Sequence, residues 1–322
     1  MPAQEWLYAR IHHRNHADGE LLLTTLVPSW LHEAGRLGIR RWFFVRYADL
    51  SGPHLRLRFR GAPGALDDCY AAGRRLWVEH ARRPPAQEAV ERLHPMAEAA
   101  IPGSGQRRLS FGLYGREYDY YGAPAAVDIA EELFQQSSEV SLEAVARTAG
   151  DRAARARIAV DVMRGCLGDL GTAQRERFWR LHWQHWTGPL SGAPALMVQA
   201  EKTAARWRRR LGEDACAAAT APGAAGLSAA ATALGRALAE GVSRAMRADP
   251  GAVASRLLLM QVHMTLNRLG FLPLEEAVLG RAAAQAPSTP APRGGPQDPV
   301  RILRSAPGPL AGRTTLTEGI SR

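Results

Sequence analysis

The stretch that decides the fold runs from residue 41 to residue 61 and reads RWFFVRYA (41–48), DLSGP (49–53) and HLRLRFRG (54–61). The first part is an apolar run rich in aromatic residues, and the last part alternates between polar and apolar residues. The middle part contains the Gly–Pro pair that is typical of a turn. Two such runs joined by a short connection predict a β-hairpin.

The alternation in the second strand separates two kinds of side chain, because successive side chains of a strand point to opposite faces. The apolar residues Leu55, Leu57 and Phe59 are expected on the core face, and the basic residues His54, Arg56, Arg58 and Arg60 on the other. Alternate positions lie about 7 Å apart, so a row of like charges needs anions, solvent or bridging acids around it. The row predicts either a solvated strand face or a site for carboxylates and peptide carbonyls, which arginine binds with paired hydrogen bonds.

The remaining pattern places strands first and helices later. A strand is predicted over residues 5–13, followed by a helix that Asp18 could cap and that bends or restarts near Pro28. A further helix covers about 63–82, and residues 107–122 are expected to be extended with a turn near Gly115. From 123 to about 279 the texture is helical, with breaks near Gly150, Gly171, Pro189, Pro222 and Pro250.

This order predicts an α+β fold in one unit over residues 1–280, with an N-terminal mixed β-sheet that contains the β-hairpin and a mostly α-helical remainder. Residues 281–322 are basic and rich in proline, which is typical of a disordered tail.

The composition limits the class of protein. The chain has 322 residues and a formal net charge of +10, which favours a polyanionic or acidic partner. No run approaches the ~20 apolar residues of a membrane span, and the first residues lack a signal-peptide core, so we expect a cytoplasmic protein with no membrane partner. The cysteines Cys69, Cys166 and Cys216 are scattered and predict neither a disulfide framework nor a metal site. A nucleic-acid partner is not expected, because no recognition motif accompanies the charge.

Two further segments carry groups that could transfer protons. The segment YGREYDYYG (114–122) holds four tyrosines, two carboxylates and an arginine, although tyrosines in an extended segment also serve sheet packing. His263 and Asn267 are four residues apart and share a helix face, although a lone helical histidine is usually structural. The set Trp179, His182, Trp183, His185 and Trp186 falls at helical spacings, and we interpret it as a packing face rather than a metal site.

Taken in order, these segments resemble a known family. WLYARI (6–11), RRWFFVRY (40–47), HLRLRF (54–59), the tyrosine segment, AEELF (130–134) and HMTLNRL (263–269) resemble the C-terminal elimination domain of class I lantibiotic dehydratases. The similarity runs from about Trp6 to Leu274. A free-standing chain of this length without the glutamylation domain most resembles the thiopeptide pyridine synthases, which share this domain.

The family's functional motifs are matched residue by residue, with one departure. In the elimination domains an HxRxR strand, a YxxExxRYGG motif and the histidine of the HM..NRL motif handle the glutamylated side chain. The matching positions are His54, Arg56, Arg58, Tyr114, Glu117, Tyr121, Gly122 and His263. Tyr120 stands in place of the motif's arginine, and Ala123 in place of its second glycine. The loss of a fixed cation removes a bidentate anchor for a glutamyl carboxylate, which favours the cyclising branch.

The resemblance implies a cofactor-independent enzyme that joins two dehydroalanines in a formal aza-[4+2] cycloaddition and expels water and the leader peptide. The expected catalytic residues are His263, Tyr121, Tyr120, Tyr114 and Glu117. The expected substrate-binding residues are His54, Arg56, Arg58, Asn267 and Arg268. The expected partner is a dehydrated, azole-bearing precursor peptide with an acidic leader, and the oligomeric state stays open. Two alternatives stay open as well, namely a split dehydratase subunit that eliminates glutamate and a leader-binding scaffold without catalysis.

Overall fold

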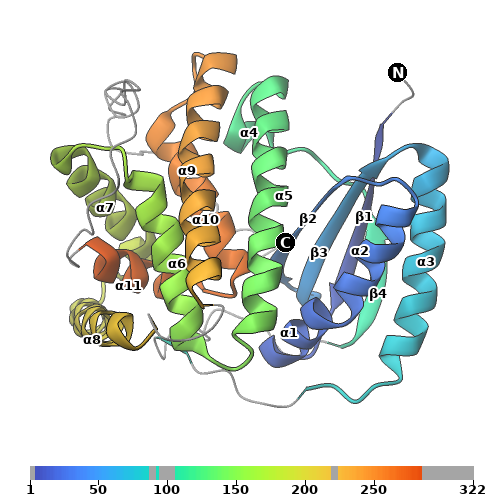
Figure 1. Ribbon diagram of the computed structural model, residues 1–322, viewed down its shortest axis with the longest axis horizontal. Coiled ribbons are helices and arrows are strands. Elements are labelled where there is room, and N and C mark those ends of the chain that lie inside the picture. The colour runs from blue at the N-terminus through green and yellow to red at the C-terminus, as the bar shows by residue number, and fades with distance from the viewer. Residues whose placement is uncertain (1–3, 87–91, 94–105, 219–223, 285–322) are drawn as a thin grey trace.

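A four-stranded sheet that contains the predicted hairpin is the centre of one half of the protein (Figure 1). The computed structural model describes residues 4–86, 92–93, 106–218 and 224–284. The strands are β1 (Glu5–His12), β2 (Arg41–Asp49), β3 (Gly52–Gly61) and β4 (Arg108–Gly112). Their order in the sheet is β2-β3-β1-β4, and each of the three pairings is antiparallel. The α+β class and the hairpin are confirmed, whereas the sheet is antiparallel throughout rather than mixed.

One face of the sheet packs against helices from the same half. These are α1 (His16–Thr24), α2 (Leu26–Arg36) and α3 (Pro63–Ala81). The core there includes the fully buried Trp30 of α2 and the three apolar residues of β3, which face it as predicted. The indole of Trp30 donates a hydrogen bond to the carbonyl of Cys69 in α3 (2.9 Å), so the two helices are also joined by a directional contact.

The first helical segment begins and breaks at residues other than those predicted. Asn15 caps α1, because its side-chain oxygen accepts a hydrogen bond from the amide of Asp18 (2.8 Å). The Asp18 carboxylate binds Arg107 instead, in a buried ion pair. The break between α1 and α2 falls at Thr25, which leaves Pro28 in the first turn of α2, where proline is tolerated.

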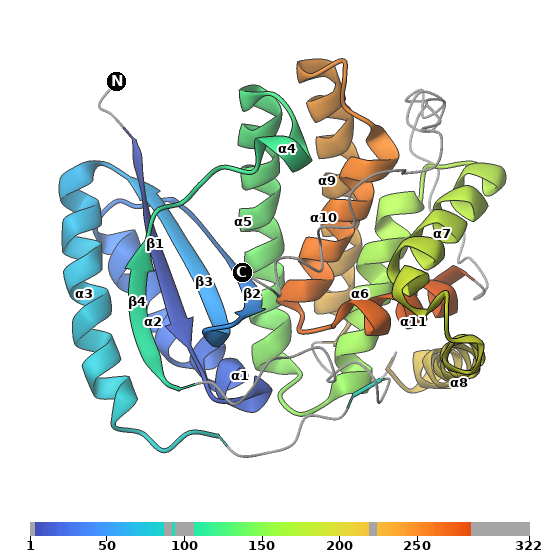
Figure 2. The ribbon, with the colours of Figure 1, turned by 180° about the vertical axis from the view of Figure 1, so that it is seen from behind.

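Helices make up the second half of the described chain (Figures 1 and 2). They are α4 (Tyr118–Tyr121), α5 (Pro124–Arg147), α6 (Arg152–Leu167), α7 (Thr172–Thr187), α8 (Pro194–Ala218), α9 (Ala224–Ala248), α10 (Ala254–Arg268) and α11 (Pro273–Ala284). The breaks predicted near Gly150, Gly171, Pro189 and Pro250 are confirmed, and Pro222 lies outside the described residues. The tyrosine segment is only partly extended, because it ends in the helical turn α4.

Side chains from α5 and α10 close the outer edge of β2, so that the two halves meet there. Ser138 of α5 accepts a hydrogen bond from the amide of Phe44 (3.1 Å), and Arg268 of α10 donates to the carbonyl of Phe44 (2.8 Å). The side-chain amide of Asn267 binds both the amide and the carbonyl of Arg46 (2.9 Å each). An edge strand offers unpaired backbone groups to other chains, and these contacts occupy that edge.

The predicted domain boundary at residue 280 falls within α11, which continues to Ala284. The rest of the predicted tail, residues 285–322, lies outside the described residues.

Candidate functional site

The basic row of β3 faces the helical half, and its members differ in burial. His54 is fully buried and Arg58 is 4% exposed, whereas Arg56 and Arg60 are partly accessible. The alternative of a solvated strand face is therefore wrong for His54 and Arg58. The four basic residues of β3 therefore lie in different environments, and the role of each depends on the residues that contact it.

Arg58 occupies a cage of aromatic rings. Its guanidinium carbon lies 5.1 Å from the ring centre of Tyr8, 5.1 Å from that of Phe43 and 4.7 Å from that of Tyr114. The Nε of Arg58 is buried and has no hydrogen-bond partner among the described residues. Burial lowers the pKa of Arg58 from its usual value, because the cation is withdrawn from water. A buried guanidinium with an unused N–H has capacity for an oxygen of a bound ligand.

Tyr121 and Glu117 lie within electrostatic range of one another and of Arg268. Tyr121 is 2% exposed and meets the ring of Phe134 edge to face, with centroids 5.0 Å apart. Burial raises the pKa of Tyr121 well above its usual value, and the charge of Glu117 adds to the rise, so the hydroxyl keeps its proton. Within the described residues, neither the Tyr121 hydroxyl nor the half-buried Glu117 carboxylate makes a hydrogen bond or ion pair.

Arg268 completes this group from α10. It is fully buried, donates to Phe44 and to the Ser138 hydroxyl (3.1 Å), and keeps one buried nitrogen, Nη2, without a partner in the part of the chain that the structure describes. Burial lowers the pKa of Arg268, while Tyr121 and Glu117 act in the opposite direction. We call Arg58, Tyr114, Glu117, Tyr121 and Arg268 the tyrosine–arginine cluster, because the charge states of its members influence one another.

Tyr114 has a structural use for its hydroxyl within this cluster. The hydroxyl donates a hydrogen bond to Glu131 of α5 (3.0 Å), which also accepts from Arg116 (2.9 Å). Burial and the charge of Glu131 raise the pKa of Tyr114. These contacts fix the segment before α4 onto α5, so that Tyr114 serves as a wall of the Arg58 cage. Tyr120, at the departing motif position, is half-buried and packs against the helical core.

His263 belongs to a second group, which we call the histidine–glutamate group. Its Nδ1 lies 2.9 Å from one oxygen of the fully buried Glu276, and the other oxygen lies 3.2 Å from Nε2 of His182. The ring of His263 stacks on the ring of Trp186, with centroids 4.3 Å apart. Burial alone would raise the pKa of Glu276, but His263 and His182 outweigh it and the net pKa lies below the usual value. The ionised carboxylate accepts from both rings, which leaves Nε2 of His263 as a proton acceptor.

The two groups lie on different sides of α10. Arg268 contacts α5 and β2, whereas His263 contacts α7 and α11. The described contacts therefore do not bring the predicted catalytic histidine against the predicted catalytic tyrosines. The predicted packing face on α7 agrees with the burial of His182, Trp183 and Trp186, whereas Trp179 is partly buried. The prediction did not include Glu276. The signal was the acidic pair Glu275–Glu276 in a helix whose only other charged residue is Arg281.

His54 and Arg56 lie in a third environment at the turn of the hairpin. His54 donates from Nδ1 to the carbonyl of Gly52 (3.0 Å) and accepts from Nε of Arg56 (3.3 Å). Burial lowers the pKa of His54 to about 4, so the ring is neutral. The guanidinium carbon of Arg56 lies 3.2 Å from the ring centre of Tyr47, and its Nη2 lies 3.9 Å from a carboxylate oxygen of Asp49. These contacts hold the turn, as the contacts of Asn267 hold β2, so three predicted substrate-binding residues have structural partners.

The described residues contain no group of histidine, cysteine and carboxylate side chains arranged to hold a metal ion. Burial raises the pKa of Cys69 to about 11 and that of Cys166 to about 12, which makes both thiols poor nucleophiles. Among the described helices, none combines the length and apolar character needed to cross a membrane.

The sequence comparisons point to one family. The family of lantibiotic biosynthesis dehydratase C-terminal domains matches residues 6–286. No curated protein sequence matches the chain.

Three solved structures have a similar fold. The tRNA-dependent lantibiotic dehydratase MibB from Microbispora sp. 107891 is 25% identical with a TM-score of 0.58, and the match covers 88% of this chain and 28% of MibB. TsrL is 18% identical with a TM-score of 0.59, and the match covers 88% of this chain and 94% of TsrL. The pyridine synthase TbtD from thiomuracin biosynthesis is 17% identical with a TM-score of 0.62, and the match covers 87% of this chain and 96% of TbtD. The chain thus spans a little over a quarter of the dehydratase.

Proposed function

This chain belongs to the family of lantibiotic biosynthesis dehydratase C-terminal domains, and on that premise we propose that it is a pyridine synthase of thiopeptide biosynthesis. The reaction is a formal aza-[4+2] cycloaddition of two dehydroalanines in a modified precursor peptide. Loss of water and of the leader peptide as a carboxamide then gives the pyridine and closes the macrocycle. The fold shared with a pyridine synthase supports this proposal, and so does the tyrosine at position 120, where the elimination motif has an arginine.

The observation that carries the proposal is the unused hydrogen-bonding capacity of the tyrosine–arginine cluster. Arg58 and Arg268 each keep a buried N–H without a described partner, beside the free hydroxyl of Tyr121 and the free carboxylate of Glu117. The cycloaddition requires the amide between the reacting units to become an imidic acid. In this proposal Glu117 accepts the amide proton, Tyr121 donates to the carbonyl oxygen, and Arg58 stabilises the charge on that oxygen.

The histidine–glutamate group serves the later elimination steps in this proposal. Glu276 holds His263 with Nε2 as the acceptor, which is the arrangement that a general base requires. Each elimination moves one ring proton to one leaving group. In water loss, Nε2 takes a proton from a ring carbon and returns it to the hydroxyl as the carbon–oxygen bond breaks. In leader release, Nε2 takes a second ring proton and delivers it to the amide nitrogen as the carbon–nitrogen bond breaks, so that the leader departs as a carboxamide and the histidine is neutral again.

The direct experiment is incubation of the protein with a dehydrated, azole-bearing precursor peptide. We expect a cyclised product and a released leader carboxamide by mass spectrometry. Tyr121→Phe removes only the hydroxyl and is expected to slow the single-turnover rate by ~10²-fold or more. The matched control is Tyr118→Phe, since Tyr118 is 45% exposed in the same segment and is expected to retain the wild-type rate. A Tyr121→Phe or His263→Ala enzyme with a near wild-type rate would contradict the assignment.

Glutamate elimination from glutamylated serine or threonine is the second candidate, and the same arginines favour it. Arg58 and Arg268 could hold the carboxylate of a glutamyl group, because guanidinium N–H groups match carboxylate oxygens. Incubation with a glutamylated peptide distinguishes the two reactions, since free glutamate is released only by elimination. Tight peptide binding without any change of mass in either substrate would indicate a scaffold.

A further inference from the structure

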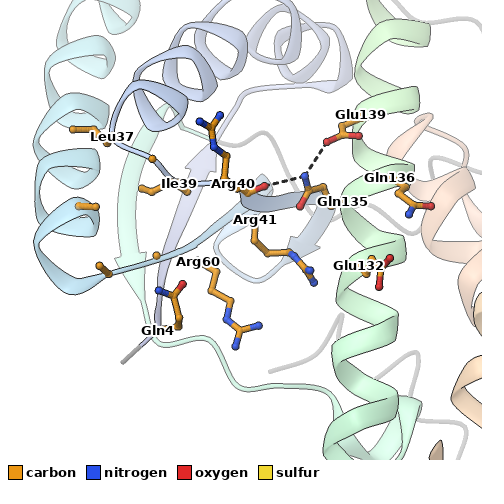
Figure 3. Close-up of a pocket in the computed structure, with 14 residues that line it drawn as sticks. Gln4, Leu37, Ile39, Arg40, Arg41, Arg60, Glu132, Gln135, Gln136 and Glu139 are labelled. Carbon is orange, nitrogen blue, oxygen red and sulfur yellow. Dashed lines mark hydrogen bonds between the residues drawn. The ribbon is translucent and has the colours of Figure 1, made fainter. Parts of the chain in front are cut away.

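Two arginines emerge from directly opposite positions of the hairpin and point into one pocket. Arg41 of β2 pairs with Arg60 of β3 in the sheet register, so their Cα atoms are about 5 Å apart. Figure 3 shows both side chains extending on the same side of the sheet, toward α5, while Arg40 extends away from them. The pocket that they enter has a volume of about 630 Å³ and is bounded by the ends of the strands and by α5.

The charges of this pair are poorly neutralised. Arg60 has its acid partner, Asp128, at 3.8 Å, and Asp128 binds Arg116 much more closely at 2.6 Å. Arg41 forms no ion pair with any described residue. The Glu132 carboxylate on the opposite wall already binds Arg244 (3.0 Å). Like charges directly opposite one another destabilise a sheet, so this arrangement is stabilised when a ligand brings negative charge.

The rest of the wall selects the chemical class of that ligand. Gln135 and Gln136 of α5 and Gln4 before β1 also line the pocket, together with Glu132 and Glu139. Side-chain amides bind peptide N–H and C=O groups, whereas the Glu139 carboxylate, which forms no ion pair among the described residues, repels a densely charged polyphosphate more than a ligand with few charges. A peptide that carries one or a few carboxylates fits both features.

The position of the pocket connects it to the tyrosine–arginine cluster. Arg60 and Arg58 are alternate residues on the same face of β3, which places them about 7 Å apart along the strand. An extended peptide advances about 3.3 Å per residue, so a chain anchored at Arg60 reaches Arg58 within two or three residues. Trp6 lies between the two regions, since its ring contacts Tyr114 (5.0 Å) and the guanidinium of Arg60 (5.9 Å).

From this geometry we propose that the pocket at Arg41 and Arg60 binds a carboxylate-bearing segment of the peptide substrate and presents the adjoining residues to the tyrosine–arginine cluster. The proposal rests on the proposed function in one respect, namely that the substrate is a peptide. It assigns a recognition role to residues that take no part in the proton transfers. Removal of the two charges is not expected to harm folding, because it relieves the repulsion between them.

The test is a binding titration that needs no turnover. The probe is a fluorescein-labelled peptide with glutamate at alternate positions, followed by fluorescence anisotropy. Replacement of both Arg41 and Arg60 by glutamine is expected to weaken binding at least about tenfold and to reduce its dependence on salt. The matched control replaces Arg74 and Arg75 by glutamine, since these are exposed on α3 and their loss changes the net charge equally.

Each result supports or overturns the proposal. A selective loss in the Arg41/Arg60 variant, with wild-type binding in the Arg74/Arg75 variant, supports it. Equal weakening in both variants, or equal binding of a peptide with glutamine in place of glutamate, overturns it. Failure to cyclise the precursor, with the selective loss intact, would sink the proposed reaction and leave the pocket assignment standing.

Discussion

The contact of Asn267 with β2 leads to a quantitative prediction. Its side-chain amide makes two hydrogen bonds to the backbone of Arg46, both 2.9 Å long and partly buried. Asn267→Ala removes both and leaves one backbone donor and one acceptor without a partner. A net loss of about 1 kcal/mol per bond, and more where the stranded group is buried, predicts a decrease of about 2–4 kcal/mol in the free energy of unfolding. The better helix propensity of alanine offsets about 0.5 kcal/mol of this loss.

The measurement is urea unfolding followed by circular dichroism. The control is Gln184→Ala, which removes the same functional group from an exposed position in α7 and is expected to change the free energy by less than about 0.5 kcal/mol. If Asn267→Ala and Gln184→Ala have the same unfolding free energy, the view that Asn267 secures the β2 edge is refuted. A raised KM with unchanged stability would instead restore Asn267 as a substrate-binding residue.

Two further predictions concern stability. Burial lowers the pKa of His13 and His54 to about 4 and that of His16 to about 3, below the ordinary 6.5. As the pH falls through 6.5, the unfolded chain therefore binds protons that the folded protein does not. The free energy of unfolding should decrease by about 2 kcal/mol per histidine between pH 7 and pH 5. Urea unfolding at several pH values across this range checks the prediction, and an unfolding free energy that does not change with pH would show that these rings titrate freely. Gly73→Ala should lower the free energy of unfolding by at least about 2 kcal/mol, because a Cβ there would overlap the fully buried ring of Trp30. Thermal denaturation checks this prediction, and a wild-type melting temperature for the variant would mean that the Trp30 ring can move aside.

The hairpin could be predicted because its signals are local. The alternation of β3 and the turn residues lie within about twenty consecutive residues, so the period of two identified the face of each side chain. The tyrosine segment was harder, since tyrosine favours strands when considered alone. Its helical turn ends at Gly122, which has φ of +94° and lies against Asp249, more than one hundred residues away. Asp249 also accepts a hydrogen bond from the amide of Ala123 (2.9 Å).

The site residues show the same division between local and distant causes. The pattern placed Arg58 on the correct face, but its burial depends on Tyr8, Phe43 and Tyr114, which come from three other segments. The partner of His263 could not be identified from spacing, because Glu276 belongs to another helix. Most of the chemical groups of the site could therefore be predicted from the sequence, whereas the contacts that bring them together could not.

The closure of the β2 edge has a consequence for the order in which the protein is made. The bonds from Asn267 and Arg268 to β2 span 221 and 224 residues of sequence, and closing a flexible loop of that size costs about 5 kcal/mol in chain entropy. The hairpin leaves the ribosome long before α10, so its edge stays open through most of synthesis and is available for pairing with another chain. Arg268 comes within electrostatic range of Arg58 only in the same late step. The tyrosine–arginine cluster is thus completed together with the closure of the β2 edge, when the last helices dock.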